Sequence, residues 1–83
     1  YFERTNDELL ACNDLIKKIK KKIQNEDKTV DGFNIGTNSG VAAGQSIMHC
    51  HIHLIPRRKG DVDNPQGGVR GVIPSKQHYI RKK

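Results

Sequence analysis

His49-Cys50-His51-Ile52-His53, at residues 49–53, places three imidazoles on alternate positions of one short segment. The alternation runs over residues 45–55, with apolar side chains at the even positions Met48, Cys50, Ile52 and Leu54. A period of two is typical of a β-strand that has one apolar face. The sequence therefore predicts a strand over 45–55, closed by Pro56, with its histidines together on the face opposite the apolar one.

Three interpretations of this histidine row remain open. Histidines two apart on a strand lie about 6.6 Å from one another and the outer two about 13 Å apart, so two could share a metal ion but the third could not reach it. The nearest acidic candidates, Asp61 and Asp63, follow a proline and a glycine. A second interpretation is that the histidines are polar residues without a function on the solvent-exposed face of the strand, although Val or Thr would suit that strand better. The third, which we favour, uses neutral imidazole as a nucleophile toward phosphorus, with His51 flanked by two further histidines.

The loop before this strand can supply donors for a phosphate. Gly44 allows the backbone to approach a ligand closely, and the Ser46 hydroxyl and nearby N–H groups belong to the same region. Because such donors can neutralise phosphate charge, the chemistry requires no metal and no other cofactor.

A helix over residues 6–24 is the clearest element upstream. Thr5 and Glu8 fit a capping box at its start. Apolar residues then recur at steps of three and four, on one stripe: Leu9, Cys12, Leu15, Ile16, Ile19 and Ile23. A strand over 32–37 follows, and Asn38-Ser39-Gly40 has the composition of a turn. From 57 to 83 we expect a loop and tail, with room for a short strand over 69–73.

Composition bounds the class of protein. A chain of 83 residues holds at most one small domain, and its two cysteines, Cys12 and Cys50, have no spacing that indicates a disulfide framework. Apolar runs are too short to span a bilayer. We expect a reduced, cytoplasmic location and no membrane partner.

The net charge of +6 favours a polyanionic partner. Most of its lysines and arginines form three blocks: Lys17 to Lys22, Arg57 to Lys59, and Arg81 to Lys83. The first is typical of a solvated helix face and the last of a terminal tail. The middle block either helps to hold phosphates or is the polar exit from the strand.

At these residues the chain resembles the histidine triad (HIT) superfamily, whose signature His-φ-His-φ-His-φ-φ (φ apolar) stands here as residues 49–55. The resemblance extends upstream through residues 33–36 and 38–46, and downstream through residues 56–61. Residues 64–74 are similar to the tail of microbial members named as dinucleoside polyphosphate hydrolases. The resemblance to the HIT superfamily implies an α+β, HIT-like fold in which an amphipathic helix packs on an antiparallel sheet.

The resemblance also implies roles for individual residues. His51 would be the nucleophile that forms a covalent nucleotidyl-imidazole intermediate, His53 would bind the α-phosphate and assist proton transfer to the leaving group, and His49 would support both. Asn38 would contact substrate near the α-phosphate or the leaving group. The phosphate pocket would be lined by Gly44, Gln45 and Ser46. Substrates would be purine nucleotides such as dinucleoside polyphosphates, nucleoside phosphoramidates or adenylated amines.

One departure concerns the extent of the domain. Members usually begin with further strands and a helix, which supply the base and ribose pocket and a fourth histidine. This sequence starts at the helix before the histidine strand, and His78 lies too far downstream to align with that fourth histidine. We therefore expect residues 1–83 to be the C-terminal portion of a single HIT domain, and we expect a two-fold homodimer.

Two other classes compete with the enzyme. A nucleic-acid-binding module would interleave aromatic rings with its cations, but Tyr1, Phe2, Phe33 and Tyr79 all lie outside the lysine runs, so we expect no specific nucleic acid partner. A catalytically incomplete nucleotide-binding or scaffold protein of the same fold is the other alternative.

Overall fold

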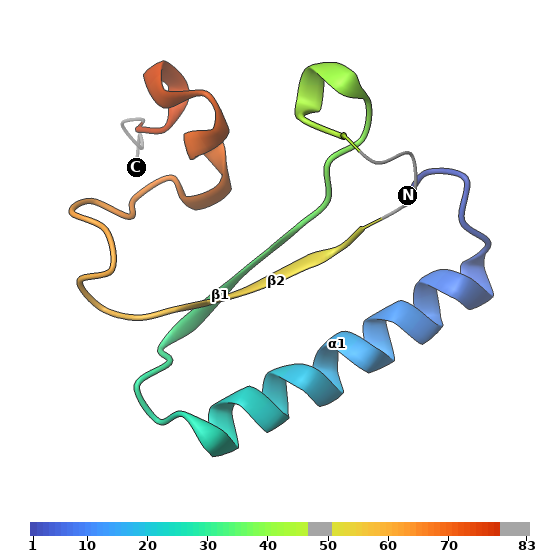
Figure 1. Ribbon diagram of the computed structural model, residues 1–83, viewed down its shortest axis with the longest axis horizontal. Coiled ribbons are helices and arrows are strands. Elements are labelled where there is room, and N and C mark those ends of the chain that lie inside the picture. Colours follow the sequence, from blue (N-terminus) through green and yellow to red (C-terminus); the bar gives the residue numbers. More distant parts are fainter. Residues whose placement is uncertain (47–50, 79–83) are drawn as a thin grey trace, which may run out of the picture.

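The computed structural model describes residues 1–46 and 51–78, which form one long helix and one antiparallel strand pair. The helix α1 spans Asn6–Glu26, and the strands β1 and β2 span Gly32–Gly36 and His53–Arg57. Helix α1 lies along one side of the strand pair, and the C-terminal segment lies on the other (Figure 1). This arrangement confirms the predicted α+β class with a helix beside an antiparallel pair.

Helix α1 begins with the predicted capping box. The Glu8 N–H donates to Thr5 Oγ1 at 3.2 Å, and the Thr5 N–H donates to Glu8 Oε1 at 3.0 Å. These bonds satisfy donors that the first turn of a helix leaves without partners. The helix continues two residues beyond the predicted end at 24 and stops at Asp27, whose N–H still bonds the Ile23 carbonyl.

The apolar stripe of α1 faces two even-numbered residues, Ile52 just before β2 and Leu54 within it. Ile52 and Leu54 are half-buried, while the odd-numbered His51, His53 and Ile55 are exposed. An apolar hollow separates helix from strand and is lined by Arg4, Leu9, Cys12, Leu15, Ile16, Ile19, Ile52 and Leu54. The predicted division into an apolar and a histidine face therefore holds at residues 51–55. Met48 and Cys50 lie outside the described residues.

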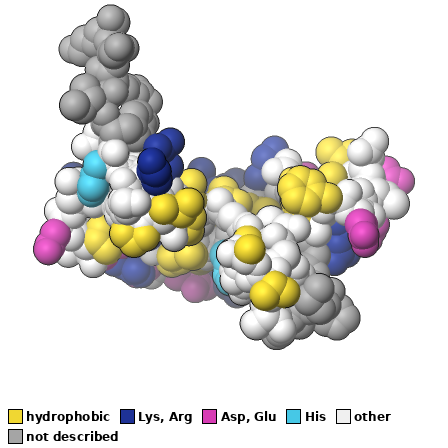
Figure 2. Space-filling view, turned by 90° about the horizontal axis from the view of Figure 1, so that it is seen from above, with side chains coloured by type: hydrophobic (Ala, Val, Ile, Leu, Met, Phe, Trp, Pro, Cys, Tyr) yellow, Lys and Arg dark blue, Asp and Glu magenta, His cyan; other side chains and the backbone are white. Residues whose placement is uncertain are grey.

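Very little of this apolar surface is hidden from water. Among the described residues, Val30 is the one apolar side chain that is buried, whereas Leu10, Leu15 and Ile35 are each more than half exposed. Figure 2 shows hydrophobic side chains reaching the surface at several separate places. No helix in the described ranges is both long and apolar enough to cross a membrane.

The position of β2 corrects the prediction of a strand over 45–55. Residues 45–46 and 51–52 are outside the ladder, and the strand runs from His53 through Pro56 to Arg57. The reason is that β1 offers only five partners, with Gly36 opposite His53 and Gly32 opposite Arg57. Alternation of side chains marks extended backbone, but the ladder extends only as far as its partner strand.

The prediction that Pro56 ends the strand is also wrong, since Pro56 lies within β2 opposite Phe33. A two-stranded pair has an open edge on each strand, and proline is tolerated where no ladder bond needs its missing N–H. The Phe33 ring lies 6.0 Å from Lys20 Nζ of α1.

The predicted option of a strand over 69–73 is wrong. Gly68–Val72 forms a 3₁₀ helix, η2, which is followed by a second one, η3, at Pro74–Lys76. Gly67 and Gly68 both adopt positive φ, so the chain turns instead of extending. The side chain and backbone of Gln77 pack so closely on Gly67 that a Cβ there would collide with the Gln77 carbonyl.

Hydrogen-bonded ion pairs fasten the end of β2 that lies away from the histidines. Arg57 Nε and Nη2 donate to the two carboxylate oxygens of Asp61 at 2.7 and 2.8 Å, and Nη1 donates to Asn34 Oδ1 at 2.5 Å. The hydrogen bonds from Arg57 and from the Arg58 N–H hold the pKa of Asp61 well below its usual range. The turn after β2 is thereby tied to β1.

Arg58 makes a second link, between this turn and the end of α1. Its Nη2 donates to Asp27 Oδ2 at 2.6 Å, and its Nε donates to Thr29 Oγ1 at 3.0 Å. The Arg58 guanidinium and the Thr29 donors lower the pKa of Asp27 far below normal. Two cations of the middle basic block are therefore engaged by the chain's own carboxylates, which favours the polar-exit interpretation of that block.

Candidate active site

The candidate nucleophile lies at the beginning of β2. His53 is the first residue of the strand and His51 precedes it by two, and both side chains are exposed. Because their neighbours Ile52 and Leu54 face the helix hollow, the two imidazoles belong to the opposite face of the chain. His49 lies outside the described residues.

A side-chain hydrogen bond holds the backbone of His51 where the strand ladder stops. The last paired residues are Gly36 and His53. Beyond this pair, the hydroxyl of Thr37, which follows Gly36, donates to the carbonyl of His51, two residues before His53, at 2.5 Å. This bond links the two strand segments beyond the ladder, and nothing in the sequence signals it apart from a hydroxyl at the end of the predicted strand.

Replacing Thr37 with valine should therefore release the His51 backbone. We expect the unfolding free energy to fall by about 0.5–1.5 kcal/mol, the net value of one such hydrogen bond. The ¹³C resonance of the His51 carbonyl should move as well. Thr37→Ser keeps the hydroxyl and is the matched control, so equal resonance changes in the two variants would show that the bond does not position His51.

Gln45 closes the loop between β1 and β2 through two hydrogen bonds with Gly40. The Gly40 N–H donates to Gln45 Oε1 at 2.7 Å, and the Gln45 N–H donates to the Gly40 carbonyl at 3.1 Å. A single 3₁₀ turn, η1 at Val41–Ala43, lies between them. Gln45, expected to line a phosphate pocket, is half-buried and holds the two ends of this turn together.

Gly44 and Asn38 lie next to each other in this loop. Gly44 has φ of +92°, in the left-handed region, and a Cβ built on it would lie 3.7 Å from Asn38 Nδ2. Ser46 is exposed. The structure thus brings Asn38, Gly44 and Gln45 into one loop, which lies at the same end of the strand pair as the start of β2 (Figure 1).

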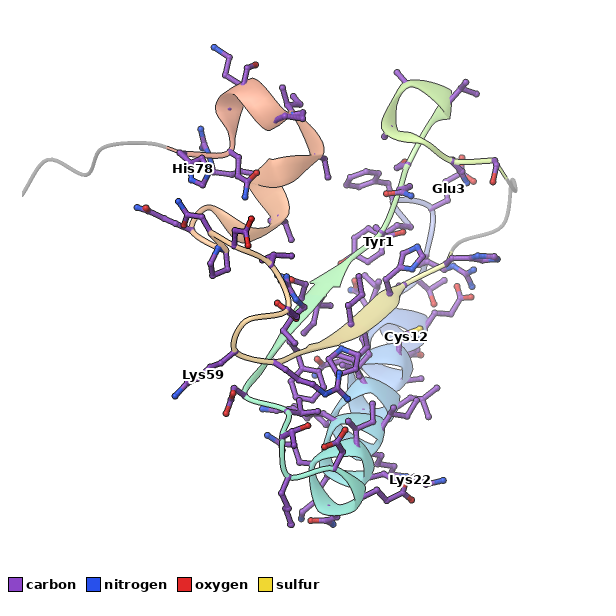
Figure 3. The ribbon with its side chains drawn as sticks, turned by 60° about the vertical axis from the view of Figure 1, so that its left-hand side comes forward. Tyr1, Glu3, Cys12, Lys22, Lys59 and His78 are labelled. Atoms are coloured by element: carbon purple, nitrogen blue, oxygen red, sulfur yellow. The ribbon has the colours of Figure 1, made fainter. Side chains whose placement is uncertain are left out.

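His78 does not join this group. It lies on the C-terminal segment, on the other side of the strand pair from Cys12 of α1 (Figure 3). It lines a polar hollow that includes Arg57 at the far end of β2, together with Asp63, Asn64 and Gln77. Over residues 1–46 and 51–78, no three His, Cys, Asp or Glu side chains gather in a way that could hold a metal ion.

Comparison with known proteins gives a family match over most of the chain. A family model described as HIT domain matches residues 1–60. An uncharacterised HIT-like protein of Methanocaldococcus jannaschii is 47% identical over 60 residues, which are 71% of this chain and 44% of that protein.

Two relatives have names that state an activity. The asymmetrical bis(5'-nucleosyl)-tetraphosphatase of Schizosaccharomyces pombe is 42% identical over 50 residues, 58% of this chain and 28% of that protein. The bis(5'-adenosyl)-triphosphatase of Dictyostelium discoideum is 47% identical over 34 residues, 41% of this chain and 23% of that protein. The chain thus spans less than half the length of these curated relatives, and no solved structure matches it significantly.

Proposed function

This chain belongs to the HIT domain family, and on that premise we propose that it acts in a nucleotide hydrolase that cleaves at the α-phosphorus. The observation that carries the proposal is the pair of exposed histidines, His51 and His53, side by side on the face away from the helix. Relatives named as dinucleoside polyphosphate hydrolases support the same class of reaction.

In the proposed reaction, a ring nitrogen of His51 attacks the α-phosphorus. A nitrogen–phosphorus bond forms while the bond from phosphorus to the leaving-group oxygen or nitrogen breaks, and His53 donates a proton to the leaving group. Water then attacks the phosphorus of the nucleotidyl-imidazole and gives a proton back to His53, while the nitrogen–phosphorus bond breaks, which releases the nucleoside monophosphate and restores both histidines. Splitting the displacement in this way replaces one difficult step by two easier ones.

The loop over residues 38–46 is proposed to stabilise the negative charge on the phosphate oxygens. Asn38 carries an amide donor next to Gly44, where a ligand can approach the backbone closely. Ser46 adds an exposed hydroxyl. His49 is proposed to support the other two histidines, the substrate to be a purine nucleotide, and the oligomer to be a homodimer.

A catalytically incomplete nucleotide-binding or scaffold protein is the alternative. It is favoured by the single buried apolar side chain among the described residues. With so little packing, the two histidines would be held less firmly than a preorganised site requires.

Product analysis with the full natural chain separates the two proposals. The chain should be incubated with diadenosine tetraphosphate and with adenosine phosphoramidate, and the products separated by chromatography. We expect release of AMP from at least one substrate. Binding of either substrate, measured by calorimetry, without any release of AMP would instead support the non-catalytic alternative.

A further inference from the structure

Gly36 lies directly beside His53 on the histidine face of the strand pair. The two residues are Cα partners in the ladder, and cross-strand partners project from the same face of a sheet. Gly36 is exposed, and a Cβ built on it would meet no atom of the described residues within 4 Å. The sheet surface next to the His53 imidazole is therefore bare among the described residues.

Within residues 1–46 and 51–78, neither backbone geometry nor packing explains a glycine at this position. The glycines with positive φ are Gly40, Gly44, Gly60, Gly67 and Gly68, and Gly36 is not among them. A side chain at Gly36 would be compatible with the strand and would strengthen it, since glycine weakens strand interiors. Glycine in a strand that needs none often marks a place where a ligand approaches the backbone.

The proposed reaction indicates which group would approach. In an in-line displacement the leaving group departs on the side of phosphorus opposite the nucleophile. With His51 as nucleophile and His53 as proton donor about 6.6 Å along the same face, that side lies toward His53 and its neighbour Gly36.

We propose that Gly36 keeps this surface clear for a bulky leaving group, so that the nucleoside polyphosphate half of a dinucleoside polyphosphate passes over its backbone. The inference rests on the proposed function and refines it to the size of leaving group that the site accepts. A small leaving group such as ammonia, from a phosphoramidate, would not extend over Gly36.

The test compares Gly36→Val with Gly32→Val in the full natural chain. Gly32 is the matched control, since it lies on the same face of β1, lacks a positive φ and also has no atom of the structurally described part of the chain within 4 Å of a built Cβ. It is paired with Arg57 at the other end of the strand, away from His53. Both variants should unfold at the wild-type temperature or above it.

For Gly36→Val we expect kcat/KM on diadenosine tetraphosphate to fall by at least about tenfold, the range produced by an added methylene in a fitted pocket. The fall on adenosine phosphoramidate should be less than about threefold, and Gly36→Ala should give an intermediate effect. Gly32→Val should leave both substrates unaffected.

Equal losses on both substrates, or no loss on either, would overturn the role of Gly36 while leaving the proposed hydrolase in place. Equal losses from Gly32→Val and Gly36→Val would overturn it as well, because the effect would then lack position dependence. A wild-type chain that hydrolyses neither substrate would overturn the proposed function and this inference with it.

Discussion

Turnover by a His51→Ala variant should fall by on the order of 10³-fold or more, because the side chain proposed to form the covalent bond to phosphorus is removed. The fold should be unaffected, since the His51 imidazole is exposed and its backbone carbonyl, which accepts the Thr37 hydrogen bond, is retained. The measurement is the rate of AMP release by the full natural chain under single-turnover conditions.

The proposed covalent intermediate gives this prediction a second readout. Quenching the wild-type reaction of a labelled nucleotide with an alkaline denaturant should leave label on the protein, because the nitrogen–phosphorus bond survives base although acid hydrolyses it, and His51→Ala should carry none. His78→Ala is the matched control, because His78 is also exposed but lies on the C-terminal segment. Unchanged turnover in the His51 variant, or an equal loss in the His78 variant, would contradict the assignment of the nucleophile.

Replacing Gly44 with valine should disrupt the loop rather than the chemistry itself. A β-branched residue at φ of +92° is a backbone outlier, and the left-handed conformation costs an L-residue about 1–2 kcal/mol. Relief of that strain would displace Asn38 and the hydrogen bonds between Gly40 and Gln45. A displacement of about 1 Å at a reacting centre costs on the order of 10²-fold in rate, so we expect a loss of that size.

Gly44→Asn separates strain from the mere presence of a side chain. Asparagine enters the left-handed region more readily than other residues, so Gly44→Asn should retain clearly more activity than Gly44→Val. Ala43→Val, within the 3₁₀ turn, controls for added bulk in the same loop. The idea fails if Gly44→Val keeps the wild-type rate or if the asparagine variant is as inactive as the valine variant.

Local signals in the sequence predicted those parts of the fold that depend on local bonds. Thr5 and Glu8 lie three apart and form their capping box within one turn of helix. The alternation of Ile52 and Leu54 with His51 and His53 gave the correct faces, because side-chain direction in extended backbone needs no partner strand.

The parts that depend on distant partners could not be predicted in the same way. The ends of β2 are set by the five residues of β1, so a pattern that continued beyond them overestimated the strand at one end and excluded Pro56 at the other. Residues 69–73 contain apolar side chains that suit a strand, but the two left-handed glycines before them lead into a 3₁₀ helix. The Thr37 bond joins residues fourteen apart, and no periodicity indicates such a contact.

The two ends of the strand pair are fastened very unequally. Arg57 and Arg58 tie the end of β2 to Asp61, Asn34 and Asp27, whereas among the described residues the histidine end has the Thr37 bond beyond its last ladder pair. Amide exchange with solvent should consequently be slowest near Arg57 and quicken toward His53, as fraying begins at the less fastened end. Thermal separation of β1 from β2 would then start at the end that carries His51 and His53. The proposed nucleotide, when bound there, would stabilise that end against separation.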